Sequence, residues 1–199
     1  MPTTLSDVRD RIRKDLHDTD ATAYRWTDAQ LDRHVDHALS EVSAAMPQEK
    51  SATLATTSGS RDVSLASLGE VMEVDTVEYP VGDYPPATTG FALWAGTLTL
   101  HVDATPAGAN AKLYYTARHT LDGSGTTLTA FQVDLVAMGA AAYALLDQAT
   151  YAADRLTTGA DPGAQYAGLG RARLTAFRQL LMQYGRKNRA RGRRLYTPA

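Results

Sequence analysis

The sequence contains no cysteine among its 199 residues. This absence excludes disulfides, thiolate nucleophiles and zinc sites built from cysteine, so the fold has to be stabilised by packing. Long apolar runs are also missing, since the most apolar stretch covers only residues 135–146 and a helix needs about 20 residues to cross a bilayer. The N-terminal segment lacks the apolar core of an export signal. The sequence therefore predicts a soluble globular protein without a membrane span.

Signatures of catalysis are absent as well. The sequence has no Walker loop, no H-E-x-x-H pattern and no nucleophile elbow. The stretch GLGRAR at 168–173 has two of the three glycines of a dinucleotide loop but follows no expected strand, so helix packing explains these glycines better. His34 and His37 have a spacing that could present two imidazoles to a metal. No third ligand is indicated, so a metal-dependent enzyme is the weakest alternative, and we expect neither an enzyme nor a cofactor.

Acidic residues are missing from the end of the chain. From Arg171 onwards there are eight arginines and one lysine, and no aspartate or glutamate, which gives this part a charge of +9. Residues 1–170 carry 11 basic and 22 acidic side chains, a net charge of −11, although the whole chain has a formal net charge of only −2. The near-neutral total therefore hides a chain with two oppositely charged parts.

The hydrophobic pattern predicts helices at both ends of the chain and strands between them. Helical periodicity is found at about 4–17, 27–46, 130–156 and 162–185. Thr27 with Gln30, and Thr129 with Gln132, have the spacing of capping boxes. Between 51 and 127 apolar residues alternate and turn residues recur, which is typical of an antiparallel β region. We expect one hairpin between 51–57 and 61–67, and another between 91–94 and 97–102 around the turn at 95–96.

The predicted fold class is therefore α+β. We expect a four-helix bundle with the antiparallel β region at about 51–127 inserted into it. The bundle and the insertion would form a single domain over 1–185, followed by an extended basic C-terminal tail at 186–199.

The basic tail predicts an anionic partner, because cations without acidic neighbours repel one another. One possible partner is nucleic acid, whose phosphates would be neutralised with counterion release. The other is an acidic protein groove, in which arginines bind carboxylates and an apolar side chain anchors the segment. Leu195, Tyr196 and Pro198 favour the protein groove, because a pure phosphate binder needs no apolar end. The net charge of −11 on the rest of the chain argues against broad contact with DNA.

Several segments in order resemble a known family. They are RWTDAQLDRHVDHALSEV (25–42), FALWAGTLTLHV (91–102), KLYYTARHTLD (112–122), DLVAMGAAAYALL (134–146) and RLTAFRQLL (173–181). Their types and order resemble the head-to-tail adaptor proteins of tailed bacteriophages, also called connector or head-completion proteins. The resemblance implies a helical bundle bearing a β element, which assembles as a homo-oligomeric ring, twelve-fold in this family, beneath the portal at the capsid vertex. It also implies that double-stranded DNA passes through the ring and that the C-terminal segment docks on the portal.

From the resemblance and the charge pattern together, we expect a structural virion protein of the neck, made in the host cytoplasm. It would bind the portal protein on one side and a neck or tail-completion protein on the other. The predicted portal-docking residues are the cations Arg186, Lys187, Arg189, Arg191, Arg193 and Arg194, with Leu195 and Tyr196 as apolar anchors. The alternative function is nucleic-acid binding through the same cations.

Overall fold

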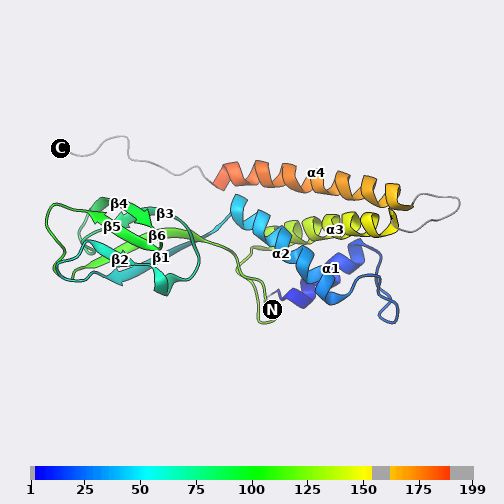
Figure 1. Ribbon diagram of the computed structural model, residues 1–199, viewed down its shortest axis with the longest axis horizontal. Coiled ribbons are helices and arrows are strands. Elements are labelled where there is room, and N and C mark those ends of the chain that lie inside the picture. The colour runs from blue at the N-terminus through cyan, green and yellow to red at the C-terminus, as the bar shows by residue number, and fades with distance from the viewer. Residues whose placement is uncertain (1–2, 154–161, 189–199) are drawn as a thin grey trace. The chain divides into compact units, whose positions relative to one another are not determined.

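The computed structural model describes residues 3–153 and 162–188 (Figure 1). The elements in chain order are α1 (Leu5–Asp15), α2 (Asp28–Ala45), β1 (Gln48–Ala55), β2 (Asp62–Ser64), the 3-10 helix η1 (Ala66–Leu68), β3 (Val71–Glu78), β4 (Thr88–Trp94), β5 (Thr97–His101), β6 (Asn110–Ala117), α3 (Ala130–Ala153) and α4 (Pro162–Asn188). The predicted α+β class is therefore confirmed. The bundle arrangement of the helices stays a prediction, and the extended tail lies outside the described residues.

The contacts divide the chain into two compact units. The helical unit consists of residues up to 46 together with those from 119 onwards, and the sheet unit consists of residues 47–118. Each unit has its own apolar core. The expectation of one domain over 1–185, followed by an extension, stays a prediction.

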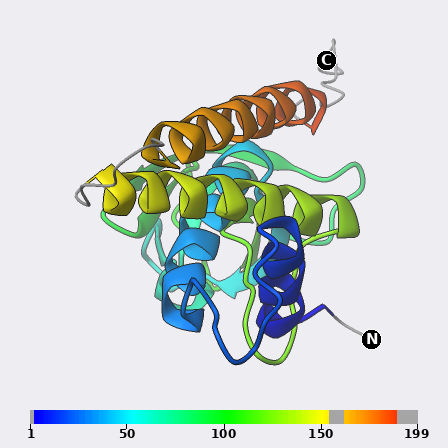
Figure 2. The same cartoon turned by 90° about the vertical axis from the view of Figure 1, so that its right-hand side faces the viewer.

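The helical unit is built around α3, which packs against α1, α2 and α4 (Figure 2). Small side chains in the centre of α3 permit this close packing. A Cβ atom added at Gly139 would lie 2.9 Å from Phe177 Cζ and 3.0 Å from Ala38 Cβ. Phe177 and Ala38 are fully buried. The glycine therefore allows α3 to lie between α2 and α4 with no side chain in the way.

The helices α2 and α3 begin with side-chain caps that the sequence predicts. At the start of α2, the Thr27 backbone N–H donates to Gln30 Oε1 at 2.8 Å, and the Gln30 backbone N–H donates to Thr27 Oγ1 at 3.3 Å. At the start of α3, Thr129 and Gln132 form the same pair of hydrogen bonds at 2.8 and 3.4 Å. Both predicted capping boxes are confirmed, and Thr4 caps α1 in the same way. Such caps satisfy backbone donors that helix geometry leaves unpaired.

The sheet unit contains a six-stranded antiparallel sheet in the order β1-β6-β3-β4-β5-β2. Its core includes Leu98, Leu100 and Leu113, each fully buried. The predicted hairpin between β4 and β5 is confirmed, since Trp94 pairs with Thr97. The two turn residues at 95 and 96 both have positive φ angles, 47° and 76°. This is the requirement of a type I′ turn, which matches the twist of a hairpin.

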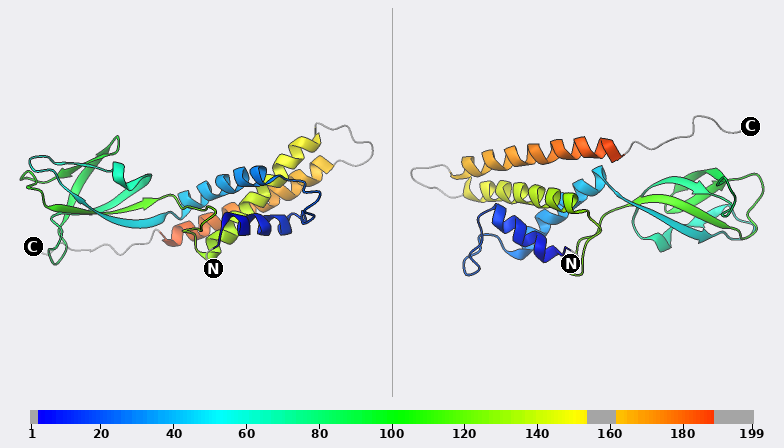
Figure 3. Two further views of the ribbon diagram at one scale, coloured as in Figure 1. Left: turned by 90° about the horizontal axis from the view of Figure 1, so that it is seen from below. Right: turned by 180° about the vertical axis from the view of Figure 1, so that it is seen from behind.

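The other predicted hairpin, between 51–57 and 61–67, is wrong. β1, in cyan, runs beside the green β6 in Figure 3 and pairs with it over its whole length, from Gln48 opposite Ala117 to Ala55 opposite Asn110. β2 pairs with β5 instead. The pairing with β6 places Leu54 of β1 against the apolar core of the sheet unit. Contacts between side chains on neighbouring strands stabilise a sheet. Here they favour β6 as the partner of β1, although β2 is closer in the sequence.

Within the helical unit, His119 joins the two chain segments that flank the sheet unit. Its backbone N–H donates to Ser43 Oγ at 3.1 Å, and its Nε2 lies 2.9 Å from the Met46 carbonyl oxygen. Its Nδ1 lies 3.0 Å from Thr127 Oγ1. Since a carbonyl can only accept, Nε2 carries the proton and Nδ1 is the acceptor. The neutral imidazole thus holds the end of α2 next to the segment that leads into α3.

Candidate docking surface around the C-terminal helix

The helix α4 is fixed to the helical unit close to its C-terminal end. A Cβ atom at Gly185 would lie 2.9 Å from the carbonyl oxygen of Ala45, the last residue of α2. The backbone of Ala45 cannot move aside as the end of a flexible side chain can. Only glycine at position 185 therefore allows α4 and the end of α2 to lie this close together. α4 continues to Asn188, three residues beyond its predicted end. The contact with the end of α2 therefore fixes the C-terminal part of α4 on the helical unit.

The predicted docking residues lie at and beyond this end. The backbone of Arg186 and Lys187 belongs to the last turn of α4, so these two residues continue the helix. Their side chains lie outside the described part of the structure. Arg189, Arg191, Arg193, Arg194, Leu195 and Tyr196 lie wholly outside the described residues. The docking role of all eight residues stays a prediction.

Arg178, an earlier cation of α4, is held by its own subunit. Its Nε lies 3.3 Å from Glu41 Oε2, and its Nη2 donates to Tyr143 Oη at 3.2 Å. The Tyr143 hydroxyl donates to Glu41. Burial by itself would raise the pKa of Glu41, but these hydrogen bonds and the charge of Arg178 outweigh burial and hold that pKa below its ordinary value. The cluster ties α4 to α2 and α3 through a charged carboxylate.

Arg173 and Arg171 are placed differently. Arg173 Nη2 donates to the carbonyl oxygen of Asp15, the last residue of α1, at 3.3 Å. The C-terminal carbonyls of a helix have no partner within the helix, so an arginine there is favourable. Arg171 is exposed and forms no ion pair among the described residues. Of the three, Arg171 is therefore the one that a partner could bind without loss of a contact within the subunit.

The glycines of the GLGRAR stretch have different surroundings. A Cβ at Gly170 would lie 2.9 Å from Leu146 Cγ and 3.3 Å from the Ala142 carbonyl oxygen. The helix-packing interpretation is therefore confirmed for Gly170. Gly168 has nothing within 4 Å of such an atom. Packing within the described subunit does not explain the glycine at 168.

The histidine pair of the metal hypothesis faces two different carboxylates. The His34 side chain is buried, with Nε2 3.7 Å from Asp147 Oδ2. His37 is exposed, stacks on the Tyr143 ring with centroids 4.2 Å apart, and has its Nε2 3.7 Å from Glu41 Oε1. No group of three or more histidine, aspartate or glutamate side chains that could hold a metal occurs among the described residues. The geometry therefore gives the metal hypothesis no support.

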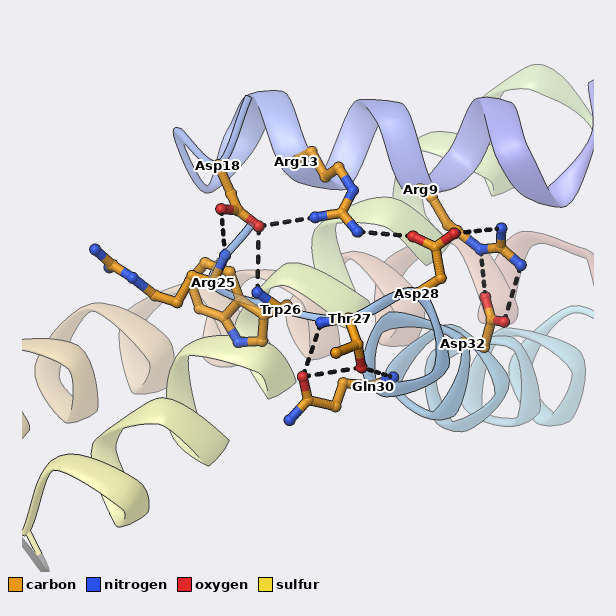
Figure 4. A network of polar contacts seen from close by, with 9 residues as sticks. All are labelled: Arg9, Arg13, Asp18, Arg25, Trp26, Thr27, Asp28, Gln30 and Asp32. Carbon is orange, nitrogen blue, oxygen red and sulfur yellow. Dashed lines mark hydrogen bonds and ion pairs between the residues drawn. The ribbon is translucent and has the colours of Figure 1, made fainter. Parts of the chain in front are cut away.

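A charge network that sequence reasoning missed joins α1 to α2 (Figure 4). Arg13 is almost fully buried and pairs with Asp18 at 2.8 Å and with Asp28 at 2.7 Å. Arg9 pairs with Asp32 at 2.6 Å and with Asp28 at 3.2 Å. Hydrogen bonding from Arg13 holds the pKa of Asp28 below its ordinary value. The alternating acidic and basic residues at 7–36 are the signal in the sequence, although they do not specify these pairs.

Asp18 also organises the loop between the two helices. Its carboxylate accepts from the backbone N–H groups of Arg25 at 2.8 Å and Trp26 at 3.3 Å (Figure 4). The Trp26 indole N–H then donates to the Ala144 carbonyl oxygen of α3 at 3.3 Å. Both oxygens of the buried Asp18 carboxylate thus accept hydrogen bonds that position Trp26, which in turn binds α3. The carboxylate is a structural group, not a ligand site.

The apolar helix α3 has the length and composition of a membrane span over Ala130–Ala152. However, 61% of its most apolar window is buried inside the helical unit. An apolar helix buried in this way is typical of a protein core. We therefore assign α3 to the core of the helical unit.

Comparison with protein families finds a match over nearly the whole chain. Residues 3–198 match the family described as SU10 adaptor protein. A search among curated proteins finds no match. The matched range includes both the helical unit and the sheet unit, so it covers the complete described fold. The chain belongs to the SU10 adaptor protein family, and its resemblance to bacteriophage head-to-tail adaptors is thereby confirmed.

Proposed function

We propose that this phage structural adaptor forms a homo-oligomeric ring, twelve-fold as the resemblance implies, between the portal and the tail. The C-terminal extension binds the portal protein, and the opposite side of the ring binds a neck or tail-completion protein. Double-stranded DNA passes through the ring without sequence recognition. The protein acts in the neck of the virion, after synthesis in the host cytoplasm, and catalyses no reaction.

The charge distribution is the observation that carries the docking proposal. Residues 186–199 contain six cations and no acidic residue, and they follow directly on the contact between Gly185 and Ala45. This contact fixes α4 close to its end at Asn188, just before the docking segment continues. Ordering the segment costs conformational entropy, which contacts with a partner have to offset. Arginines can do so by binding carboxylates in pairs of hydrogen bonds.

Truncation tests this role. Deleting 189–199 removes four of the six cations and both apolar anchors, and leaves α4 intact. We expect binding to purified rings of the portal protein encoded by the same phage to fall at least tenfold, with an unchanged helical circular dichroism signal. Undiminished portal binding by the truncated chain would contradict the proposal.

A matched variant separates charge from geometry. Replacing Arg189, Arg191, Arg193 and Arg194 by lysine keeps the charge but removes the forked guanidinium donors. We expect portal binding to weaken in this variant, although less than in the truncated chain.

Titration with random duplex DNA at two salt concentrations tests the alternative function. Tight DNA binding with a steep salt dependence, lost on truncation while portal binding persists, would favour nucleic-acid binding.

A further inference from the structure

The outward face of α4 carries no charge along its centre. The exposed residues of this face recur every three or four positions, namely Gln165, Gly168, Ala172, Thr175, Gln179 and Met182. Leu169 and Met182 are 49% and 58% exposed. Exposed helix faces in soluble proteins are usually rich in charged residues. We refer to these six residues, together with Leu169, as the α4 face.

Gly168 lies in the middle of this face. A glycine inside a helix costs about 1 kcal/mol relative to alanine. At Gly139, Gly170 and Gly185, close contact with another part of the helical unit accounts for the glycine. At Gly168 nothing lies within 4 Å of the position of a Cβ. The space above Gly168 is therefore open to the backbone or a side chain of another molecule.

The charges beside the face indicate the chemistry of that molecule. Residues 162–185 contain three arginines and no acidic residue. Residues 3–46, which contain α1 and α2, carry nine acidic and six basic side chains. In Figure 2, α3 lies between α4 and α1, which meet only where Arg173 reaches the end of α1 among the described contacts, and the α4 face is the side of α4 that is exposed rather than packed on α3. Complementary surfaces on different helices of one unit suit contact between successive copies of the same chain.

We infer that the α4 face packs against the outer surface of α1 and α2 of a second copy of this chain. The inference rests on the proposed ring and names the surfaces that close it. A contact between two different surfaces is repeated from copy to copy and generates a ring when the rotation closes. Arg171 at the edge of the face then lies near the acidic surface of the next copy, on which Asp10 is exposed and forms no ion pair among the described residues. A contact of α4 with α4 would instead bring arginines together and stop at a dimer.

The absence of cysteine from the chain permits a direct test by crosslinking. We would prepare Gly168→Cys, Asp10→Cys and the double variant, each as full-length protein, alone and mixed with portal rings. A short bismaleimide then joins cysteines that lie close together. We expect a ladder of species larger than dimers from the double variant only, because each copy would be joined to two neighbours.

The other crosslinking outcomes each overturn the inference. Dimers from Gly168→Cys alone would show that α4 packs against α4 of a second copy. Rings seen by electron microscopy without a ladder from the double variant would place the contact elsewhere and leave the proposed function standing. Failure to form rings either alone or on portal would overturn the proposed function as well.

Substitution of Gly168 gives an independent readout. Gly168→Ala and Gly168→Gln both add helix propensity at an open position, so we expect both to raise the unfolding temperature of the monomer. The glutamine side chain fills the space that the neighbouring copy needs. We expect Gly168→Gln to raise the subunit concentration for half-maximal ring formation at least tenfold, and Gly168→Ala to have a smaller effect. Ring formation by Gly168→Gln at the wild-type concentration would overturn the inference.

Discussion

Adding a single methyl group at Gly139 should destabilise the helical unit. In Gly139→Ala the new Cβ would lie 2.9 Å from Phe177 Cζ and 3.0 Å from Ala38 Cβ, whereas ordinary contacts begin at 3.4 Å. Both neighbours are fully buried, so neither can move into solvent. The strain has to be relieved by shifting α3 relative to α2 or α4.

The size of the effect follows from two opposing terms. Overpacking of a well-packed core costs about 1–3 kcal/mol. Replacing a glycine inside a helix by alanine contributes about 0.8–1.0 kcal/mol of stability. Gly168→Ala is the matched control, because it has the same helix-propensity gain with nothing within 4 Å of the new atom. The difference between the two variants isolates the packing term, and we expect Gly139→Ala to be less stable than Gly168→Ala by about 1–3 kcal/mol.

The assay is urea unfolding of the full-length variants, followed by the helical circular dichroism signal. All four described α-helices belong to the helical unit, so this signal reports on that unit even if the sheet unit unfolds separately. Dilute protein keeps the chain monomeric and removes any effect of Gly168 on assembly. Equal stabilisation by the two alanine substitutions would refute the close packing of α3 between α2 and α4.

Two further predictions concern buried polar groups. In Asp18→Ala the buried Arg13 and two backbone N–H groups lose their acceptor, so we expect a loss of about 3–5 kcal/mol in the free energy of unfolding, measured by urea titration. His119 is buried, and burial holds its pKa below the ordinary 6.5 even though a hydrogen bond to Met46 opposes this. Below 6.5 the unfolded chain binds a proton that the folded chain does not, so thermal stability should fall as pH decreases from about 7 to about 5. His119→Gln should flatten this dependence without removing it, because burial also lowers the pKa of His34. An unchanged dependence of the unfolding temperature on pH in this variant would contradict its assignment to His119.

Features that depend on short segments could be predicted from the sequence. The capping boxes at Thr27 and Thr129 were found because both partners of each box lie three residues apart. The hairpin of β4 and β5 was found because two turn residues join its strands directly. The pairing of β1 with β6 was missed, since the partners are separated by more than 50 residues and burial of Leu54 decides between them.

The surroundings of α4 could be predicted only in part, for the same reason. The sequence indicates a helix with small residues and cations, but it does not show which glycine contacts another helix. It also gives no sign that Arg178 binds Glu41, because these residues lie 137 positions apart. Only the packing of α4 on α2 and α3 distinguishes the open position of Gly168 from the close contact at Gly170. The same packing distinguishes Arg178, which binds Glu41, from the exposed Arg171.

This distinction changes the charge that is available for docking. The sequence assigns nine cations to the region from residue 171 onwards. Arg178 is neutralised by Glu41, and Arg173 is used at the C-terminal end of α1. Arg171 lies beside the α4 face, at the proposed contact between copies. Arg173 and Arg178 therefore hold α4 to its neighbours, and the six cations that follow Gly185 are those that the docking proposal assigns to the portal. A docking interface needs complementary acidic groups for a charge of about six rather than nine, and its affinity should fall with salt accordingly.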